Sequence, residues 1–286
     1  MIKLYRKPLV TKELLNTLIQ YSIILDYQEL PELCNIYYDI LNKYSVEYIS
    51  LSRPRDWNDL DELKNVLDKC SGLGIANPTH IPYWVIRELS CVSRKYPVSS
   101  HISETEYMEK TGGLHYLLSN NVLLKHVVHG TFLDDWELKL LSDLNIPLII
   151  TPRSNLWFLH KLPNILKAFE YNVTIALGTD NAGCFHPDIW IEAYILAYLL
   201  KIPIDKLLEM ILINGYRAIG RKPLTIEEGS RAYFMIVDLG LANTRSGFPL
   251  FSIINRILWS RRKIIVKNNK LYVLETRSKP RIGLNI

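Results

Sequence analysis

The chain has 286 residues, in which 34 Lys and Arg stand against 29 Asp and Glu, and its formal net charge is +5. This length can bury one barrel-sized core or two ordinary ones. The small charge, with no basic stripe interleaved with aromatic residues, argues against nucleic-acid binding. No apolar run approaches the about 20 residues of a membrane-spanning helix, so we expect no membrane insertion.

The cysteines are widely spaced and form no CxxC pair; they are Cys34, Cys70, Cys91 and Cys184. Met1 leads into charged residues without the apolar core of a signal peptide. We therefore expect reduced thiols in a cytoplasmic protein.

Short apolar runs typical of strands alternate along the chain with amphipathic runs typical of helices. The sequence predicts strands at residues 1–10, 22–27, 45–52, 71–79, 97–104, 122–130, 146–155 and 173–180. Helices are predicted between them at residues 11–20, 31–44, 59–70, 83–96, 134–145 and 162–172, and then at 188–200 and 203–220, while the stretch around 112–121 is less regular. About eight βα units favour a closed (β/α)₈ barrel of the TIM type over an open sheet.

The chain changes character near Gly229, where strand-like sequence becomes dominant. Residues 231–239 and 264–274 are predicted strands, with a hairpin-like turn at Asn268 and Asn269. We therefore expect two parts, a barrel over residues 1–225 and a small β-rich segment over residues 226–286. Two or three strands are marginal without a cover, so we expect the segment to pack on the barrel or on a partner subunit of a homo-oligomer.

Ionisable side chains stand where three of the predicted strands end. His101 is followed three residues later by Glu104, His129 ends another apolar run, and Asp180 follows a third. Parallel neighbouring strands bring such ends to one rim, where imidazole and carboxylate groups suit a metal ion or a hydrolytic water.

These residues lie in motifs that resemble the amidohydrolase superfamily, in its cytosine deaminase, chlorohydrolase and S-adenosylhomocysteine deaminase branch. The motifs are HISE at 101–104, HGTFLDDWELKLLSDLNIPLIITPRSN at 129–155 and LGTDNAG at 177–183. The similarity is collinear from about Gly72 to Gly220. The resemblance implies a metal-dependent hydrolase with one Zn²⁺ or Fe²⁺ that cleaves C–N bonds, and deamination of a small nitrogen heterocycle or nucleoside as its reaction.

The resemblance also implies a role for each matching residue. His101 and Asp180 would be metal ligands, and Asp180 would act as a general base as well. Glu104 would carry a proton from the attacking water to the substrate. His129 would stabilise the developing negative charge or hold the water.

Further residues are predicted to reach the same rim and bind substrate. Arg53 can clamp an anionic group and Trp57 can stack on a planar base. Asn155 is predicted at a strand end, and His186 follows Asp180 in the same loop. His126 is out of phase with His129, so we expect it to face the helices.

The sequence departs from the family pattern at its start. The family carries an HxH pair, preceded by a β segment, whereas the 286 residues contain no HxH and their first histidine is His80. Catalytic zinc normally has three protein ligands, and His101 with Asp180 supplies two.

Three explanations remain open at this point. The barrel is degenerate and binds a ligand or a partner subunit instead of a metal, or another chain supplies the HxH strand. Alternatively another residue completes the site, such as His80, His126 or His186, or Lys7 replaces the cation's charge.

Overall fold

The computed structural model describes residues 17–18, 20–28, 30–239, 249–260, 262–267 and 270–275. It divides into two compact units, residues 1–223 and 224–286, which are described separately below. The predicted first strand with Lys7, and the predicted turn at Asn268 and Asn269, lie outside the described residues.

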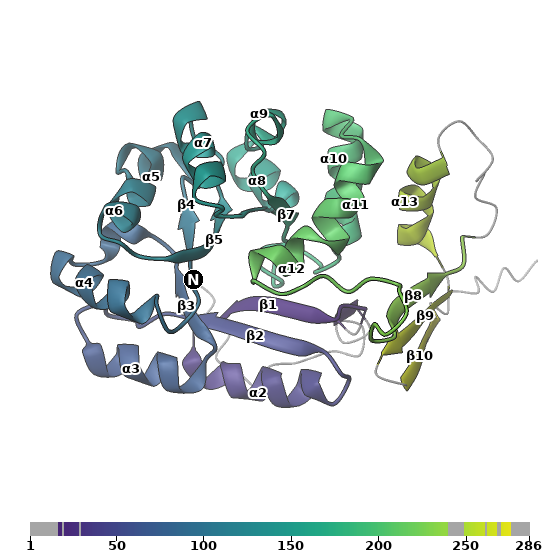
Figure 1. Ribbon diagram of the computed structural model, residues 1–286, viewed down its shortest axis with the longest axis horizontal. Coiled ribbons are helices and arrows are strands. Elements are labelled where there is room, and N and C mark those ends of the chain that lie inside the picture. Colours follow the sequence, from purple (N-terminus) through teal and green to yellow (C-terminus); the bar gives the residue numbers. More distant parts are fainter. Residues whose placement is uncertain are drawn as a thin grey trace, which may run out of the picture. The chain divides into compact units, whose positions relative to one another are not determined.

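The first unit is built on a curved sheet of parallel strands (Figure 1), each hydrogen-bonded to the next in chain order. The strands are β1 (Ile23–Gln28), β2 (Glu47–Ser52), β3 (Gly72–Ile75), β4 (Val98–Ile102), β5 (Leu124–His129), β6 (Leu148–Ile150) and β7 (Ile175–Leu177). The predicted α/β fold with parallel strands in sequence order is therefore confirmed. An eighth strand that closes the barrel stays a prediction.

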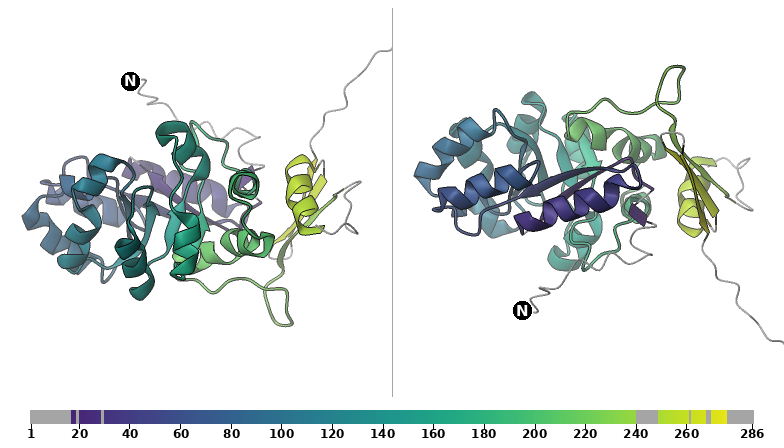
Figure 2. Two further views of the ribbon diagram at one scale, coloured as in Figure 1. Left: turned by 90° about the horizontal axis from the view of Figure 1, so that it is seen from above. Right: turned by 90° about the horizontal axis from the view of Figure 1, so that it is seen from below.

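Helices follow the strands, and most of them lie along the outside of the curved sheet, as the views in Figures 1 and 2 agree. Three helix starts follow directly from the sequence: Pro31 begins its helix, Asp59 caps the next, and Asp134 forms a capping box with Glu137. The helices are α2 (Pro31–Asn42), α3 (Leu60–Lys69), a 3₁₀ turn η1 (Pro78–His80), α4 (Tyr83–Val92), α5 (Glu106–Lys110), α6 (Gly113–Ser119), α7 (Asp135–Asp143), α8 (Pro152–Leu159), α9 (Ile165–Glu170), α10 (Ile189–Leu200), α11 (Ile204–Leu212) and α12 (Asn214–Ala218).

Three helical regions differ from the expectation. The stretch called less regular contains one short helix, α6, and a second short helix that was not expected, α5, precedes it. The single helix expected at 203–220 is two helices, α11 and α12. The strand expected at 146–155 ends at Ile150, because Pro152 occupies the first helical position of α8. Asn155 therefore lies in a helix and not at a strand end.

The interior of the curved sheet contains His126, which corrects the expectation that this residue faces the helices. Its side chain is only 1% exposed, its Nε2 lies 3.4 Å from Tyr27 Oη, and its Nδ1 lies 3.2 Å from the Ala218 carbonyl oxygen. The expectation failed because it counted strand alternation from His129, whose φ of 71° breaks that alternation.

Cys34 of α2 and Cys70 at the end of α3 form a disulfide with a Cα–Cα distance of 5.4 Å. The expectation of reduced thiols is therefore wrong for these two residues, because the sequence spacing did not show that α2 and α3 pack together. Cys91 and Cys184 are free and exposed. The cysteines consequently give no support to a cytoplasmic location.

The second unit contains a three-stranded antiparallel sheet of β8 (Tyr233–Val237), β9 (Arg262–Lys267) and β10 (Lys270–Glu275), in the order β10-β9-β8. The predicted strands are thus present. The sequence did not reveal α13 (Pro249–Trp259), whose isoleucines favour a strand by propensity. Ile254 and Ile257 are buried at helical spacing, so packing decides in favour of the helix.

No helix in the described part of the chain is both long enough and apolar enough to cross a membrane.

Candidate functional site

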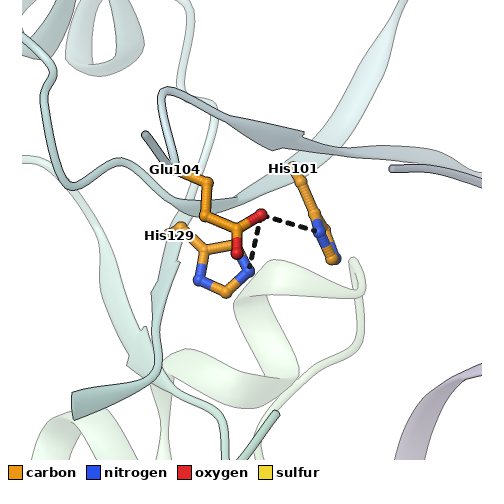
Figure 3. Close-up of side chains that lie close together, drawn as sticks. All are labelled: His101, Glu104 and His129. Carbon is orange, nitrogen blue, oxygen red and sulfur yellow. Dashed lines mark ion pairs between the residues drawn. The ribbon is translucent and has the colours of Figure 1, made fainter. Parts of the chain in front are cut away.

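Three side chains converge where β4 and β5 end (Figure 3). His101 belongs to β4, Glu104 lies in the loop that follows β4, and His129 is the last residue of β5. His101 pairs with Val128 and Ile102 with His129 in the parallel register, so the two strands end side by side. The sheet thus brings together the residues that the sequence placed at separate strand ends.

One carboxylate oxygen faces both imidazoles. Glu104 Oε2 lies 3.7 Å from His101 Nδ1 and 3.8 Å from His129 Nε2, as the dashed lines in Figure 3 show. The imidazole rings are nearly perpendicular, with centroids 4.6 Å apart. Among the described residues these three side chains are the group that could hold a metal ion, with one donor atom from each lying within 4.8 Å of the others.

The backbone at this rim adopts conformations that side chains normally avoid. Ser103 has φ 49°, His129 has φ 71° and Asp180 has φ 58°, and each follows or ends a strand. The other described non-glycine residues with positive φ follow helices, where a left-handed residue is an ordinary ending. Left-handed residues cost free energy and are frequent at functional sites, which makes this rim the candidate site.

Charge and burial set the protonation states in the cluster. A hydrogen bond with His101 holds the pKa of Glu104 below its ordinary value, against the opposing effect of burial, and the two imidazoles add attraction. Burial lowers the pKa of His129 to about 4, with a smaller contribution from His101. At neutral pH the cluster therefore presents an ionised Glu104 beside a neutral His129.

A buried row of polar side chains stands behind His129, and the sequence analysis did not find it. Thr151 Oγ1 lies 3.1 Å from His129 Nδ1 and 3.0 Å from Asn155 Oδ1. Asn155 Nδ2 donates to Thr131 Oγ1 at 2.6 Å. Thr151 and Asn155 both lie in the motif TPRSN, but they come together only because α8 begins at Pro152.

Asp180 lies beside this row without joining the three-residue cluster. Its Oδ2 accepts a hydrogen bond from Ser154 Oγ, and its side chain is exposed in the loop after β7. Its charge is near enough to oppose the lowering of the His129 pKa. Its predicted part as a metal ligand is not tested by these contacts.

Two of the residues predicted to bind substrate, Arg53 and Trp57, lie in a cleft. Arg53 and Trp57 line a cleft of about 460 Å³ between the loops after β2 and β3, together with Asn77 and His80. Ile75 pairs with Ser100, so this cleft opens beside the strand that carries His101.

The other two residues predicted to bind substrate are held by contacts within the chain. Asn155 is 1% exposed and its amide is engaged by two threonines. His186 is exposed, its Nε2 lies 3.2 Å from Thr17 Oγ1, and its carbonyl oxygen accepts from Arg153.

Comparison with known proteins identifies the fold's relatives. Residues 51–271, more than half of the chain, match the model of the amidohydrolase family. The chain belongs to the amidohydrolase family. The resemblance of the HISE, HGTF and LGTD motifs is thereby confirmed.

Curated relatives of this amidohydrolase have deaminase names. The 5-methylthioadenosine/S-adenosylhomocysteine deaminase of Pyrococcus furiosus is 30% identical over 209 residues, which cover 64% of this chain and 49% of that protein. The 5'-deoxyadenosine deaminase of Methanococcus maripaludis is 29% identical over 208 residues, covering 63% and 48%. The amidohydrolase chain thus spans about half the length of the curated relatives it matches.

Solved structures share the amidohydrolase fold at low identity. A zinc-bound adenosine deaminase from Xanthomonas campestris superposes with a TM-score of 0.74 at 16% identity, over 92% of this chain and 71% of that one. Atrazine chlorohydrolase from Arthrobacter aurescens, complexed with zinc, gives 0.74 at 12% identity, over 90% and 69%.

Proposed function

We propose that this amidohydrolase is a metal-dependent hydrolase of C–N bonds that deaminates a nitrogen heterocycle or nucleoside. The observation that carries the proposal is that His101 and His129 both face the same carboxylate oxygen of Glu104, at the rim where the parallel strands end. The names of the relatives, which act on adenosine-like compounds, support the substrate class.

The donor chemistry of the cluster fits a divalent cation. Two histidines and one glutamate are a known ligand set of catalytic zinc, whose bonds of about 2.0–2.2 Å place neighbouring donors roughly 3.3 Å apart. The two histidine–carboxylate separations are 3.7 and 3.8 Å, and all three donor atoms lie within 4.8 Å of one another, so the side chains would have to draw together around the ion. A bound divalent cation would supply a water whose pKa is lowered from about 16 to about 7. Zn²⁺ is favoured over Fe²⁺ by the zinc-bound structural relatives.

The proposed reaction uses both protons of the attacking water. The water oxygen bonds the ring carbon that carries the amino group, and Glu104 transfers one water proton to the ring nitrogen. Asp180, oriented by Ser154, transfers the second proton to the amino nitrogen. The C–N bond then breaks, and ammonia and the keto product leave.

Two assignments from the sequence remain in the proposal as predictions. Asp180 as a metal ligand would require its carboxylate to move toward His101 from its hydrogen bond with Ser154. Arg53 and Trp57 are proposed to bind the part of the substrate that does not react, because their cleft lies beside the strand of His101.

Ammonia release tests the proposed function directly. The full chain loaded with Zn²⁺ is incubated with adenosine, 5'-deoxyadenosine, methylthioadenosine, S-adenosylhomocysteine and guanine. We expect at least one compound to release ammonia, and Glu104→Gln to lower the rate by at least about 10²–10⁴-fold, because proton transfer is lost and one proposed metal donor is weakened. Glu106→Gln, an exposed change in the adjacent helix, should leave the rate unchanged.

A rate that is the same in Glu104→Gln and in the unaltered protein would contradict the proposal. No release from any compound, with zinc bound, would favour the second candidate, a degenerate barrel that binds a ligand or a subunit. That candidate is the alternative that the sequence analysis left open.

We also propose that the chain self-associates through one face of its C-terminal sheet. Phe234 and Leu271 flank Val266 in register, and Ile236 and Val273 flank Ile264 in the same way. The four flanking residues are exposed, so the face is a contiguous apolar patch of the kind that interfaces cover. A cytoplasmic location remains a prediction.

A further inference from the structure

The buried row behind His129 determines which nitrogen of that ring carries the proton. His129 is 2% exposed, Thr151 2% and Asn155 1%, so water does not replace their mutual hydrogen bonds. Each member must therefore donate or accept in a way that satisfies its neighbours.

The orientation of the Asn155 amide follows from donors whose role is certain. The backbone N–H of Thr151 can only donate, and it lies 3.3 Å from Asn155 Oδ1. On the other side Asn155 Nδ2 lies 2.6 Å from Thr131 Oγ1, where it donates. The amide oxygen consequently faces Thr151 and the amide nitrogen faces Thr131.

The direction of the next hydrogen bond follows from that orientation. Thr151 Oγ1 lies 3.0 Å from Asn155 Oδ1, and a carbonyl oxygen can only accept, so the Thr151 hydroxyl donates its one proton there. The Thr151 hydroxyl can therefore only accept a hydrogen bond from His129. His129 Nδ1, at 3.1 Å, must therefore carry the ring proton and donate to Thr151 Oγ1.

A neutral imidazole with its proton on Nδ1 presents a bare lone pair on Nε2. Nε2 is the atom that points toward Glu104 Oε2 at 3.8 Å, into the cluster (Figure 3). A second residue that fixes the distal nitrogen is the arrangement by which proteins orient metal-binding histidines.

We propose that His129 is a metal ligand through Nε2, completing a three-donor site for a divalent cation with His101 and Glu104, and that Thr151 and Asn155 are positioning residues that fix its tautomer. The assignment of His129 as a metal ligand rests on the proposed function. The assignment of its tautomer is independent of that function. With His129 the site has the three protein ligands that catalytic zinc normally keeps, and this role replaces the predicted contact of His129 with the reacting substrate.

Nitrogen-15 NMR of the histidine rings in the metal-free full chain tests the tautomer. We expect the His129 signals of a ring protonated at Nδ1, assigned by their loss in His129→Gln. His126 is an internal control, because its Nδ1 faces the Ala218 carbonyl oxygen and must also be protonated. A His129 ring protonated at Nε2 in the unaltered protein would overturn the inference without any variant.

Variants separate positioning from packing. Thr151→Val removes the hydroxyl at nearly constant size and should release the His129 tautomer while leaving the His126 signals unchanged. Thr151→Ser keeps the hydroxyl and should preserve the tautomer. If Thr151→Val leaves the His129 signals as they were, the positioning role is wrong.

Zn²⁺ affinity, measured by equilibrium dialysis, tests the ligand assignment without reference to catalysis. We expect Thr151→Val to weaken binding by about 10–100-fold, Thr151→Ser to restore it, and His129→Ala to abolish it. Undiminished affinity in His129→Ala would overturn the assignment. Tight Zn²⁺ binding without ammonia release would instead contradict the proposed function and leave this inference standing.

Discussion

Tyr27 connects the interior of the sheet with the candidate site at the scale of single residues. Its hydroxyl donates to Ser99 Oγ, its ring lies 5.4 Å from the His101 ring, and it shares the interior with His126. Gly74 on the adjoining part of β3 leaves the space that the Tyr27 ring fills, since a Cβ there would lie 2.4 Å from Tyr27 Cδ1. The Tyr27 ring beside His101 thus has its space because residue 74 is a glycine.

Gly74→Ala should lower the free energy of unfolding by about 1–3 kcal/mol, because the added methyl group must displace the Tyr27 ring. Urea denaturation measures the change. Gly215→Ala is the matched control, since nothing lies within 4 Å of the added Cβ in helix α12 and alanine favours a helix by about 0.5–1 kcal/mol. Equal stability of Gly74→Ala and the unaltered protein would contradict the packing described.

At this scale the sequence was informative where a residue's chemistry is tied to a strand end. His101, Glu104 and His129 were predicted for that reason, and the structure places them together. Thr151 and Ser154 were missed because their roles arise only when the chain turns into α8. The sequence alone does not show which hydrogen-bond partner a Ser or Thr hydroxyl will have in the folded chain.

At the scale of elements, a pair of carboxyl groups, the buried Glu137 and the half-buried Glu109, links the two helices that begin after Glu104 and His129. Burial raises the pKa of Glu137 in α7 to about 8, and a hydrogen bond with Glu109 of α5 adds to the effect. Asp134 at the start of α7 opposes it through a backbone hydrogen bond, and His115 of α6 lies 3.6 Å from Glu137 Oε1. At neutral pH the Glu137 carboxyl is therefore largely protonated.

The pH dependence of this pair has a definite sign. Because its folded pKa lies above the unfolded value, Glu137 contributes stability that is fully present below about pH 4.5 and is lost as the pH rises through about 8. Glu137→Gln keeps the capping box and removes the titration. The stability of the unaltered protein relative to this variant, from thermal melts, should therefore fall between about pH 5 and 9.

Glu106→Gln, also on α5 but exposed, should show no such trend relative to the unaltered protein. A constant difference between the unaltered protein and Glu137→Gln over the same pH range would contradict the raised pKa of Glu137.

The disulfide between α2 and α3 makes a second prediction about elements. It closes a separation of 36 residues, and such a loop contributes about 2–4 kcal/mol to stability. Replacing Cys34 and Cys70 together by alanine should lower stability by this amount in urea denaturation. Replacing exposed Cys91 and Cys184 should change it little. Four reactive thiols in unreduced, denatured protein, instead of two, would contradict the disulfide.

At the scale of the whole molecule, strand order was predictable because each parallel strand needs a helical crossover, which the alternation of apolar and amphipathic runs records. Closure of the barrel stays a prediction, since the first expected strand, at residues 1–10, lies outside the described residues. Helix α13 was missed because isoleucine-rich helices and strands look alike over a short run. The sequence of this chain does not identify the surface that packs on the apolar face of the C-terminal sheet.

Self-association through the apolar face predicts a response to charge. Leu271→Glu should convert a dimer or larger oligomer to monomer, measured by size-exclusion chromatography with light scattering, because a buried carboxylate at an interface is costly. Ile226→Glu is the control, since Ile226 is exposed in the same unit but lies outside the sheet. A monomeric unaltered protein would rule out the interface.

The most direct test of the metal-dependent site is the zinc content of the full chain after dialysis against a slight excess of Zn²⁺, determined by elemental analysis. We predict about one ion per chain in the unaltered protein and none in the His101→Ala/His129→Ala double variant, with both proteins folded by circular dichroism. No bound zinc in the unaltered protein, or an undiminished amount in the double variant, would contradict the account.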